Sequence, residues 1–102
     1  MTLNVGGFTF NGPFLSTSSI KNKSGVYVIL CEKKQNQFSL IDVGESSEVK
    51  TRLENQGRKK CWKNNCKGTL HFAVYYTPNI QTERIKVEQE LRDQYNPPCG
   101  KT

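Results

Sequence analysis

The chain lacks any apolar run of membrane-spanning length, and its first residues lack the basic start and apolar stretch of a signal peptide. It also lacks internal repeats and low-complexity tracts, so its 102 residues leave room for one domain and one modest core. These absences predict a cytoplasmic protein that does not enter the membrane. In that compartment its four cysteines are expected to be reduced thiols.

Acidic residues are scarce relative to basic ones, at 9 against 15, which gives a formal net charge of +6. The excess is concentrated in residues 50–67, where the only acid is Glu54, and such a strip suits contacts with the phosphates of a nucleic acid. The alternative is a solvated lysine-rich surface that keeps a small protein soluble. The candidate nucleic-acid-binding residues of this strip are Lys50, Arg58, Lys59, Lys60, Lys63 and Lys67.

The cysteines allow two interpretations. Cys61 and Cys66 lie close in sequence, with His71 nearby, so a small zinc-stabilised interaction domain is one hypothesis. Their spacing is wider than that of most structural zinc sites, and free cysteine commonly behaves as a small buried apolar residue.

Hydrophobic patterning predicts three strands, at residues 25–31, 38–43 and 70–76, of which the first two form an antiparallel hairpin across a polar turn. Helices are expected after Ser46 or Ser47, around residues 59–63, and from Pro78 to the Pro97-Pro98 stop. The predicted fold is therefore α+β: a small, mostly antiparallel sheet of three strands, or slightly more, flanked by helices.

The N-terminal residues are predicted to be an accessory to this fold. Residues 1–23 are expected to form an extension or a short hairpin that packs on the core, and residues 24–102 the main domain. Asn11-Gly12 is a turn signal, and Pro13 directly after it limits the returning strand to the edge of a sheet.

Four features occur in an order that resembles the GIY-YIG nuclease family over residues 25–100. Gly25-Val26-Tyr27 is similar to the first half-motif, and Asp42-Val43-Gly44 stands at the second. Arg52 follows on the next predicted helix, and Glu88 lies on the last helix, before Tyr95 and Pro97.

The resemblance implies a metal-dependent endonuclease that acts on DNA. It implies Tyr27 as the base for the attacking water, Arg52 as the phosphate-binding cation and Glu88 as the ligand of Mg²⁺ or Mn²⁺. The residue types agree with this chemistry, because phosphodiester cleavage needs a nucleophilic water, a cation at the phosphate and stabilisation of developing charge. The alternatives from the residues alone are ordinary surface ion pairs for Arg52 and Glu88 and a half-buried sheet tyrosine for Tyr27.

Three positions depart from the family pattern. Asp42 replaces a tyrosine, Glu45 follows the glycine where a lysine is common, and Gly100 stands where an asparagine is expected. Asp42 is then a candidate second catalytic acid or metal ligand, since hard cations favour carboxylates. The same departures fit a non-catalytic nucleic-acid-binding module of the same fold. A module of this size is expected to act with a protein partner, as a homodimer, or with weak sequence preference.

Overall fold

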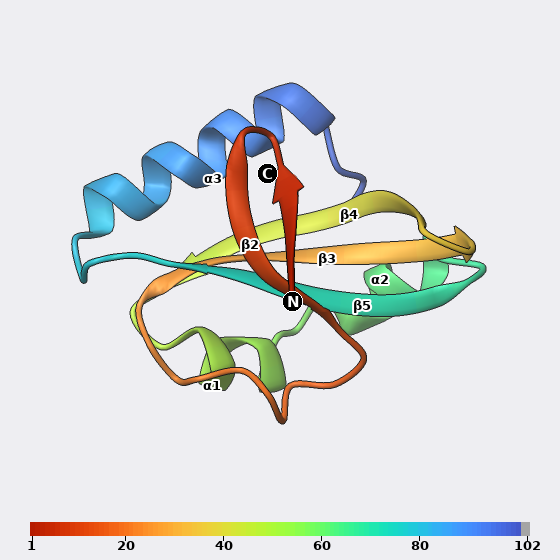
Figure 1. The fold of residues 1–102 in the computed structure, drawn as a ribbon, viewed down its shortest axis with the longest axis horizontal. Helices are drawn as coiled ribbons and strands as arrows, with labels where there is room; N and C mark the ends of the chain where they lie inside the picture. The colour runs from red at the N-terminus through yellow and green to blue at the C-terminus, as the bar shows by residue number, and fades with distance from the viewer. Residues whose placement is uncertain (101–102) are drawn as a thin grey trace.

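The computed structural model describes residues 1–100, and the last two positions of the predicted main domain lie outside them. Five strands form one antiparallel sheet in the spatial order β1-β2-β5-β3-β4, with three helices packed around it (Figure 1). Within the described residues, no helix is both long and apolar enough to span a bilayer. The strands are β1 (Thr2–Val5), β2 (Phe8–Phe14), β3 (Gly25–Lys34), β4 (Gln37–Ser46) and β5 (Thr69–Tyr76). The helices are α1 (Val49–Glu54), α2 (Lys59–Asn64) and α3 (Gln81–Tyr95).

The prediction of a three-stranded sheet flanked by helices is wrong. The N-terminal hairpin joins the sheet, because β2 pairs with β5 at Asn11–Val74 and Phe14–Phe72. The five strands curl into an open half-barrel, which carries the β1–β2 turn toward the end of α3 (Figure 1). There the Gly6 N–H donates to the Tyr95 hydroxyl at 2.9 Å.

The turn of this hairpin also differs from the sequence prediction. It lies at Gly6-Gly7, and Asn11-Gly12 lies inside β2. Pro13 does not confine β2 to an edge, since β2 lies between β1 and β5. The register between β2 and β5 shifts between Asn11 and Phe14, and an irregularity of this kind accepts a residue that cannot donate to the ladder.

The other predicted elements are confirmed. β3 and β4 form the expected antiparallel hairpin, and β5 pairs with the other side of β3 in the same sheet. In α1, Val49 and Leu53 are buried on the inner face, as their spacing of four residues predicts. The basic helix α2 and the long helix α3 lie where the sequence places them.

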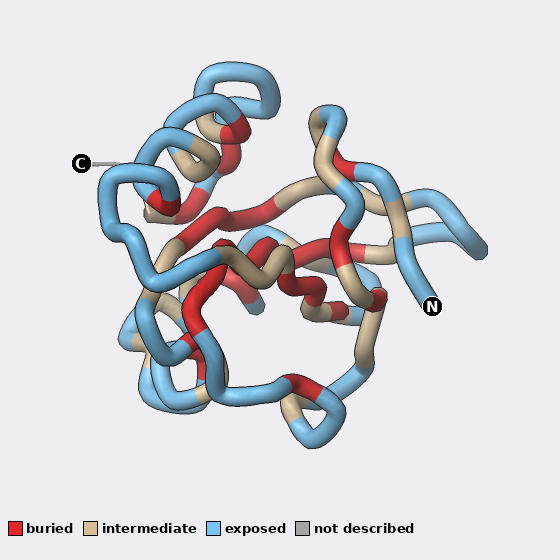
Figure 2. The backbone as a smooth tube through the Cα atoms, turned by 60° about the vertical axis from the view of Figure 1, so that its left-hand side comes forward, coloured by how far each residue is buried: buried red, intermediate tan, exposed pale blue. Residues whose placement is uncertain are grey.

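β3 is the centre of the molecule, because both of its faces are buried. Val26, Val28 and Leu30 face a core that includes Leu91 of α3. Tyr27, Ile29 and Cys31 face a second core, which includes Val49, Leu53 and Trp62 of α1 and α2. The buried residues accordingly follow the central strands and the side of α3 turned toward the sheet (Figure 2). Two hydrophobic layers therefore hold α3 on one face of the sheet and the two short helices on the other.

The prediction of reduced cysteines is wrong, since all four are paired. Cys31 of β3 is bonded to Cys66, and Cys61 of α2 is bonded to Cys99 in the C-terminal segment. The zinc hypothesis on Cys61, Cys66 and His71 fails with it, because sulfurs in disulfides are not thiolate ligands. The two bridges fasten α2 to the sheet and fasten the C-terminal segment to α2.

We expect the Cys61→Ser/Cys99→Ser double variant to lower the free energy of unfolding by about 2–4 kcal/mol, because a cross-link across a long loop restricts the unfolded chain. Denaturant titration without reductant measures this change. The matched control is wild type alkylated in denaturant without reductant, in which no cysteine should be labelled. Alkylation of all four cysteines in that control would contradict the disulfide assignment.

Candidate functional site

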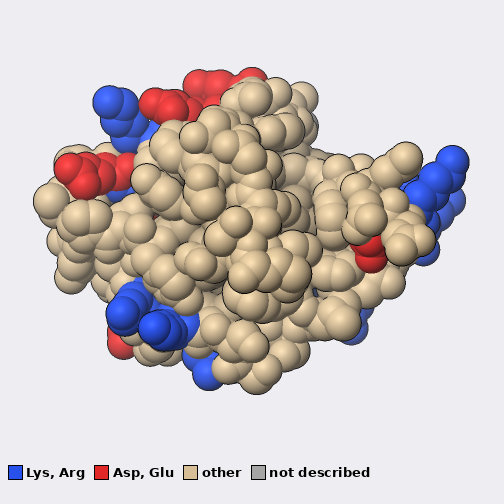
Figure 3. Space-filling view, in the orientation of Figure 1, with Lys and Arg blue, Asp and Glu red and all other residues tan. Residues whose placement is uncertain are grey.

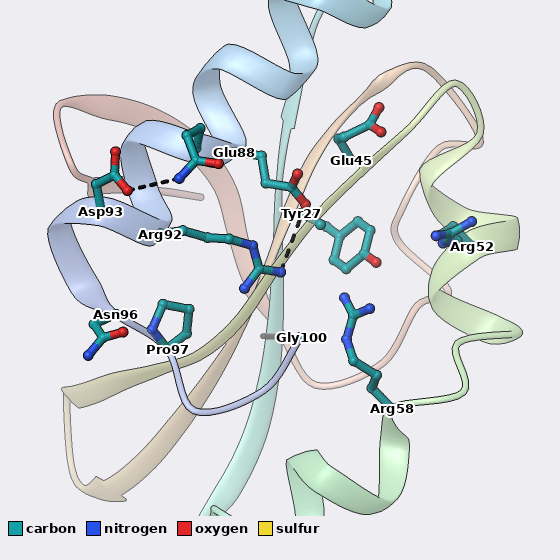
Figure 4. Close-up of a pocket in the computed structure, with 12 residues that line it drawn as sticks. Tyr27, Glu45, Arg52, Arg58, Glu88, Arg92, Asp93, Asn96, Pro97 and Gly100 are labelled. Carbon is teal, nitrogen blue, oxygen red and sulfur yellow. Dashed lines mark hydrogen bonds and ion pairs between the residues drawn. The ribbon is translucent and has the colours of Figure 1, made fainter. Parts of the chain in front are cut away.

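A polar cleft of about 580 Å³ opens where β3, β4, α1, α3 and the C-terminal segment meet. Tyr27, Arg52 and Glu88, which the family resemblance singles out, all line it (Figure 4). They come from three elements that are far apart in sequence. The fold therefore brings the three together at one concave surface, while their chemical roles remain predictions.

Tyr27 forms the floor of the cleft and is only 1% exposed. Its hydroxyl accepts a hydrogen bond from Gln56 Nε2 at 2.7 Å. Burial raises the pKa of Tyr27 above its ordinary value, and the charge of Asp42 adds to that shift. The charges of Arg58 and Arg52 and the Gln56 hydrogen bond lower the pKa in the opposite direction.

Gly44 is what allows the tyrosine ring to lie there. Tyr27 and Gly44 are cross-strand partners of β3 and β4, and a Cβ at position 44 would overlap the Tyr27 ring and hydroxyl. The glycine of the second half-motif thus has a steric reason in this chain. It provides the space in which an aromatic side chain crosses the neighbouring strand.

Arg52 lies on α1 at the side of the cleft and is exposed. Within residues 1–100 its guanidinium makes no ion pair, so the alternative of an ordinary surface ion pair is not seen for Arg52. An exposed and unpaired guanidinium at a cleft is free to bind an anion from solution.

Glu88 projects from α3 toward the same space (Figure 4). Its Oε2 lies 3.9 Å from Arg92 Nη2, a loose ion pair. Burial raises the pKa of Glu88 above its ordinary value, the charges of Glu45 and Asp42 add to it, and Arg92 and Arg58 oppose it. Of the other cleft carboxylates, Glu45 is bound by Arg84 Nε at 2.8 Å, and Asp93 accepts a hydrogen bond from Gln89 Nε2 at 2.8 Å.

These carboxylates set what metal the cleft fits. Among residues 1–100, no three histidine, cysteine, aspartate or glutamate side chains gather into a group able to hold an ion. Mg²⁺ at phosphate-processing sites is commonly bound by one or two carboxylates, with substrate phosphate and water in the other positions. Glu88 therefore matches the ligand type of such a site as a single carboxylate, and substrate and water would have to supply the other positions.

Asp42 lies beneath the cleft and not within it. Its side chain is wholly buried, and its oxygens accept hydrogen bonds from side chains of two other elements and of the segment before α2. The side-chain donors are Arg58 Nε at 2.7 Å and Nη2 at 3.3 Å, Trp62 Nε1 at 2.8 Å and Arg92 Nη2 at 3.1 Å. The backbone N–H of the next residue, Val43, also donates, at 2.8 Å. Because Asp42 does not line the cleft and both of its oxygens are occupied by these donors, its predicted role as a second acid has no geometric support.

Arg92 and Gln56 are site residues that sequence reasoning missed. Arg92 lines the cleft, and besides Asp42 it donates to the backbone carbonyls of Val43 and Cys99. The available signal was its position four residues after Glu88 on a helix, which puts both on one face. Gln56 lies in the irregular segment between α1 and α2, where no periodicity indicates orientation.

The C-terminal segment lines the cleft beside Arg58 and Arg92. The Cys99 N–H donates to the Ile41 carbonyl at 3.0 Å, and the disulfide to Cys61 holds the same residue. Gly100 follows with φ +78°, and a Cβ there would lie 2.6 Å from both Arg92 Nη2 and Asp42 Oδ1. Only glycine suits this position on both counts.

The predicted basic strip divides into two parts. Arg58 belongs to the cleft, whereas Lys59, Lys60, Lys63 and Lys67 are exposed on and after α2, and Lys50 is half-buried on α1. The face that carries β1, β2 and β5 is largely uncharged, with basic side chains at its margins and most of the acidic ones along the side of α3 (Figure 3). Four lysines of the strip thus lie on and after α2, apart from the cleft that Arg58 lines.

Comparison of the chain with protein-family models, curated proteins and solved structures finds no match.

We expect Gly44→Ala to lower the free energy of unfolding by about 1–3 kcal/mol, because the added methyl group displaces the Tyr27 ring from the cleft floor. Denaturant titration measures the loss. Gly57→Ala is the matched control, since no atom lies within 4 Å of its added Cβ, and it should change stability little. Equal effects of the two substitutions would show that Tyr27 does not occupy the space above Gly44.

Proposed function

We propose that this protein is a metal-dependent endonuclease of the GIY-YIG type that hydrolyses phosphodiester bonds in DNA. The observation that carries the proposal is the presence of Tyr27, Arg52 and Glu88 at one cleft. These side chains supply a candidate base, a candidate phosphate-binding cation and a carboxylate for a metal ion.

In this mechanism a backbone phosphate of DNA enters the cleft, and Arg52 binds its oxygens with two parallel donors. The Tyr27 phenolate takes a proton from water as the water oxygen bonds to phosphorus. The P–O bond to one sugar oxygen breaks, and that oxygen takes a proton from solvent. The positive charges of Arg58 and Arg52 and the Gln56 hydrogen bond favour the phenolate that this role requires. When bound at Glu88, Mg²⁺ or Mn²⁺ would offset the negative charge that develops on the phosphate.

Burial opposes part of this mechanism, and it sets a direction for the pH dependence. Because the pKa of Tyr27 is raised by burial, the phenolate fraction is small at neutral pH and increases as the pH rises. Cleavage that depends on this base should accordingly accelerate through the alkaline range.

A second candidate function is a nucleic-acid-binding module without cleavage. The burial of Asp42 favours it, because the residue at the second half-motif serves as a structural carboxylate and not as a reactive acid. Of the acids that line the cleft, Glu45 is paired with Arg84, Asp93 is bound to Gln89, and Glu88 has only a loose ion pair. Such a module would bind DNA through Arg52 and the exposed lysines of α2.

The cellular location is part of the proposal. A cytoplasmic location stays a prediction from the sequence, and the two disulfides weigh against it, because such bonds persist mainly in oxidising compartments. An enzyme with these bonds would act on DNA outside a reducing cytosol.

We expect Glu88→Ala to lower metal-dependent nicking of supercoiled plasmid by about 100-fold or more, since a metal at the phosphate contributes several kcal/mol to catalysis. Binding to DNA in the absence of metal should persist, because cations make the phosphate contacts. Glu90→Gln is the matched control, as it removes a carboxylate from the exposed side of the same helix. It should leave nicking unchanged.

Wild-type protein that binds DNA but cleaves neither duplex, branched nor single-stranded substrates with Mg²⁺ or Mn²⁺ would favour the binding module. A Lys59→Gln/Lys60→Gln/Lys63→Gln variant separates the two roles of charge. The variant should bind all DNA sequences more weakly. Its cleavage rate at saturating substrate should equal that of wild type.

A further inference from the structure

Asp42 is buried between two arginines that both reach the cleft. Arg58 holds it with two parallel hydrogen bonds, and Arg92 Nη2 also donates to the Oδ1 atom. The bidentate geometry fixes the plane of the Arg58 guanidinium, and the carbonyls of Val43 and Cys99 fix that of Arg92. Both guanidinium groups are therefore oriented before any ligand arrives.

The charges of this cluster do not balance. One buried carboxylate faces two guanidinium groups, which leaves an excess positive charge at the floor of the cleft. Glu45 is paired with Arg84, and Glu88 has only the 3.9 Å contact with Arg92. Arg52 adds a further cation at the side, and Asp93, whose Oδ1 accepts a hydrogen bond from Gln89 Nε2 at 2.8 Å, adds a further acid to the lining. What the cleft offers an anion is therefore the local set of guanidinium donors on Arg52, Arg58 and Arg92.

Donor atoms remain for that anion. Arg58 donates to Asp42 through Nε and Nη2. Within residues 1–100 the Nη1 atom of Arg58 has no hydrogen-bond partner. The Arg58 side chain is 32% exposed and extends into the cleft beside Gly100 (Figure 4). Arg92 likewise uses Nη1 and Nη2, and its Nε has no partner among the same residues.

We propose that Arg58 and Arg92, oriented by the buried Asp42, form with Arg52 a phosphate-binding subsite that needs no metal ion. Asp42 is a positioning residue in this subsite, and the arginines contact the phosphate. Gly100 keeps the space above the two guanidinium groups open, since a side chain there would meet both of them. The inference rests on the proposed function only for the identity of the ligand as a phosphate of a polynucleotide backbone.

The single tryptophan provides a direct probe of the subsite. Trp62 Nε1–H donates to Asp42 Oδ2 at 2.8 Å, so its indole ¹H–¹⁵N resonance reports on the same carboxylate. A phosphate that draws the arginines toward itself weakens their hold on Asp42 and shifts this resonance. Titration of wild type with inorganic phosphate in EDTA should give a saturable shift.

The Arg58→Gln variant should bind phosphate about tenfold more weakly or worse, since it loses a charge-assisted hydrogen bond. Arg58→Lys keeps the charge beside Asp42 and protects the fold, and it should still weaken binding several-fold, because lysine lacks the two-point geometry. Arg52→Gln should weaken binding in the same direction. Lys60→Gln is the matched control, with an equal charge change on exposed α2, and it should bind as wild type does.

The subsite is refuted if Lys60→Gln weakens phosphate binding as much as folded Arg58 variants do, or if folded Arg58 variants bind like wild type. A second titration with a short single-stranded oligothymidylate in EDTA tests the source of the phosphate. It should shift the Trp62 resonance with the same dependence on Arg58, and a shift with inorganic phosphate alone would overturn the assignment to a polynucleotide.

The two proposals fail separately. Phosphate and oligothymidylate binding that depends on Arg58, together with no cleavage under any condition, would support the subsite and contradict the endonuclease. Cleavage that is insensitive to Arg58, in a protein without a saturable phosphate shift, would support the endonuclease and contradict the subsite.

Discussion

The hydrogen bonds that converge on the Asp42 carboxylate connect four segments around the cleft. They reach β4, where the residue lies, α2 through Trp62, the start of α2 through Arg58, and α3 through Arg92. Removing one partner of a buried, hydrogen-bonded charge is strongly destabilising, on the order of several kcal/mol, so these contacts act together. The position of the arginines relative to Tyr27 and Glu88 depends on this one buried group.

The surrounding structure explains why such a carboxylate is tolerated. β3 is buried on both faces. One of its two cores also contains residues of the two short helices and Cys99 of the C-terminal segment, and Asp42 lies on the neighbouring strand. The disulfides from Cys31 to Cys66 and from Cys61 to Cys99 restrain α2 and the C-terminal segment at the same place. In a chain of this size cross-links compensate for a limited hydrophobic core, and here they also fix the walls of the cleft.

Local sequence patterns predicted the elements that carry their own signals. The β3–β4 hairpin, β5 and the inner face of α1 follow from alternation, β-forming residues and the spacing of Val49 and Leu53. The shared cleft of Tyr27, Arg52 and Glu88 followed from a family resemblance, since nothing in periodicity relates strands and helices so far apart.

Non-local pairing is what the sequence could not predict. The β2–β5 ladder and the pairing of four cysteines depend on which segments meet in space, and Pro13 pointed away from an inner strand. Asp42 is a candidate second acid by sequence, although it lies between Ile41 and Val43 in a strand whose apolar run indicates burial. Its two arginine partners come from other elements, so only the fold identifies it as an anchor.

A crystal structure of the protein with a short phosphorothioate oligonucleotide in metal-free buffer tests the central claim most directly. The account predicts a backbone phosphate in the cleft, with its oxygens within hydrogen-bond distance of Arg52 and Arg58 and with Asp42 still bound to Arg58 and Arg92. An oligonucleotide that lies along the lysines of α2 without a phosphate in the cleft would contradict it.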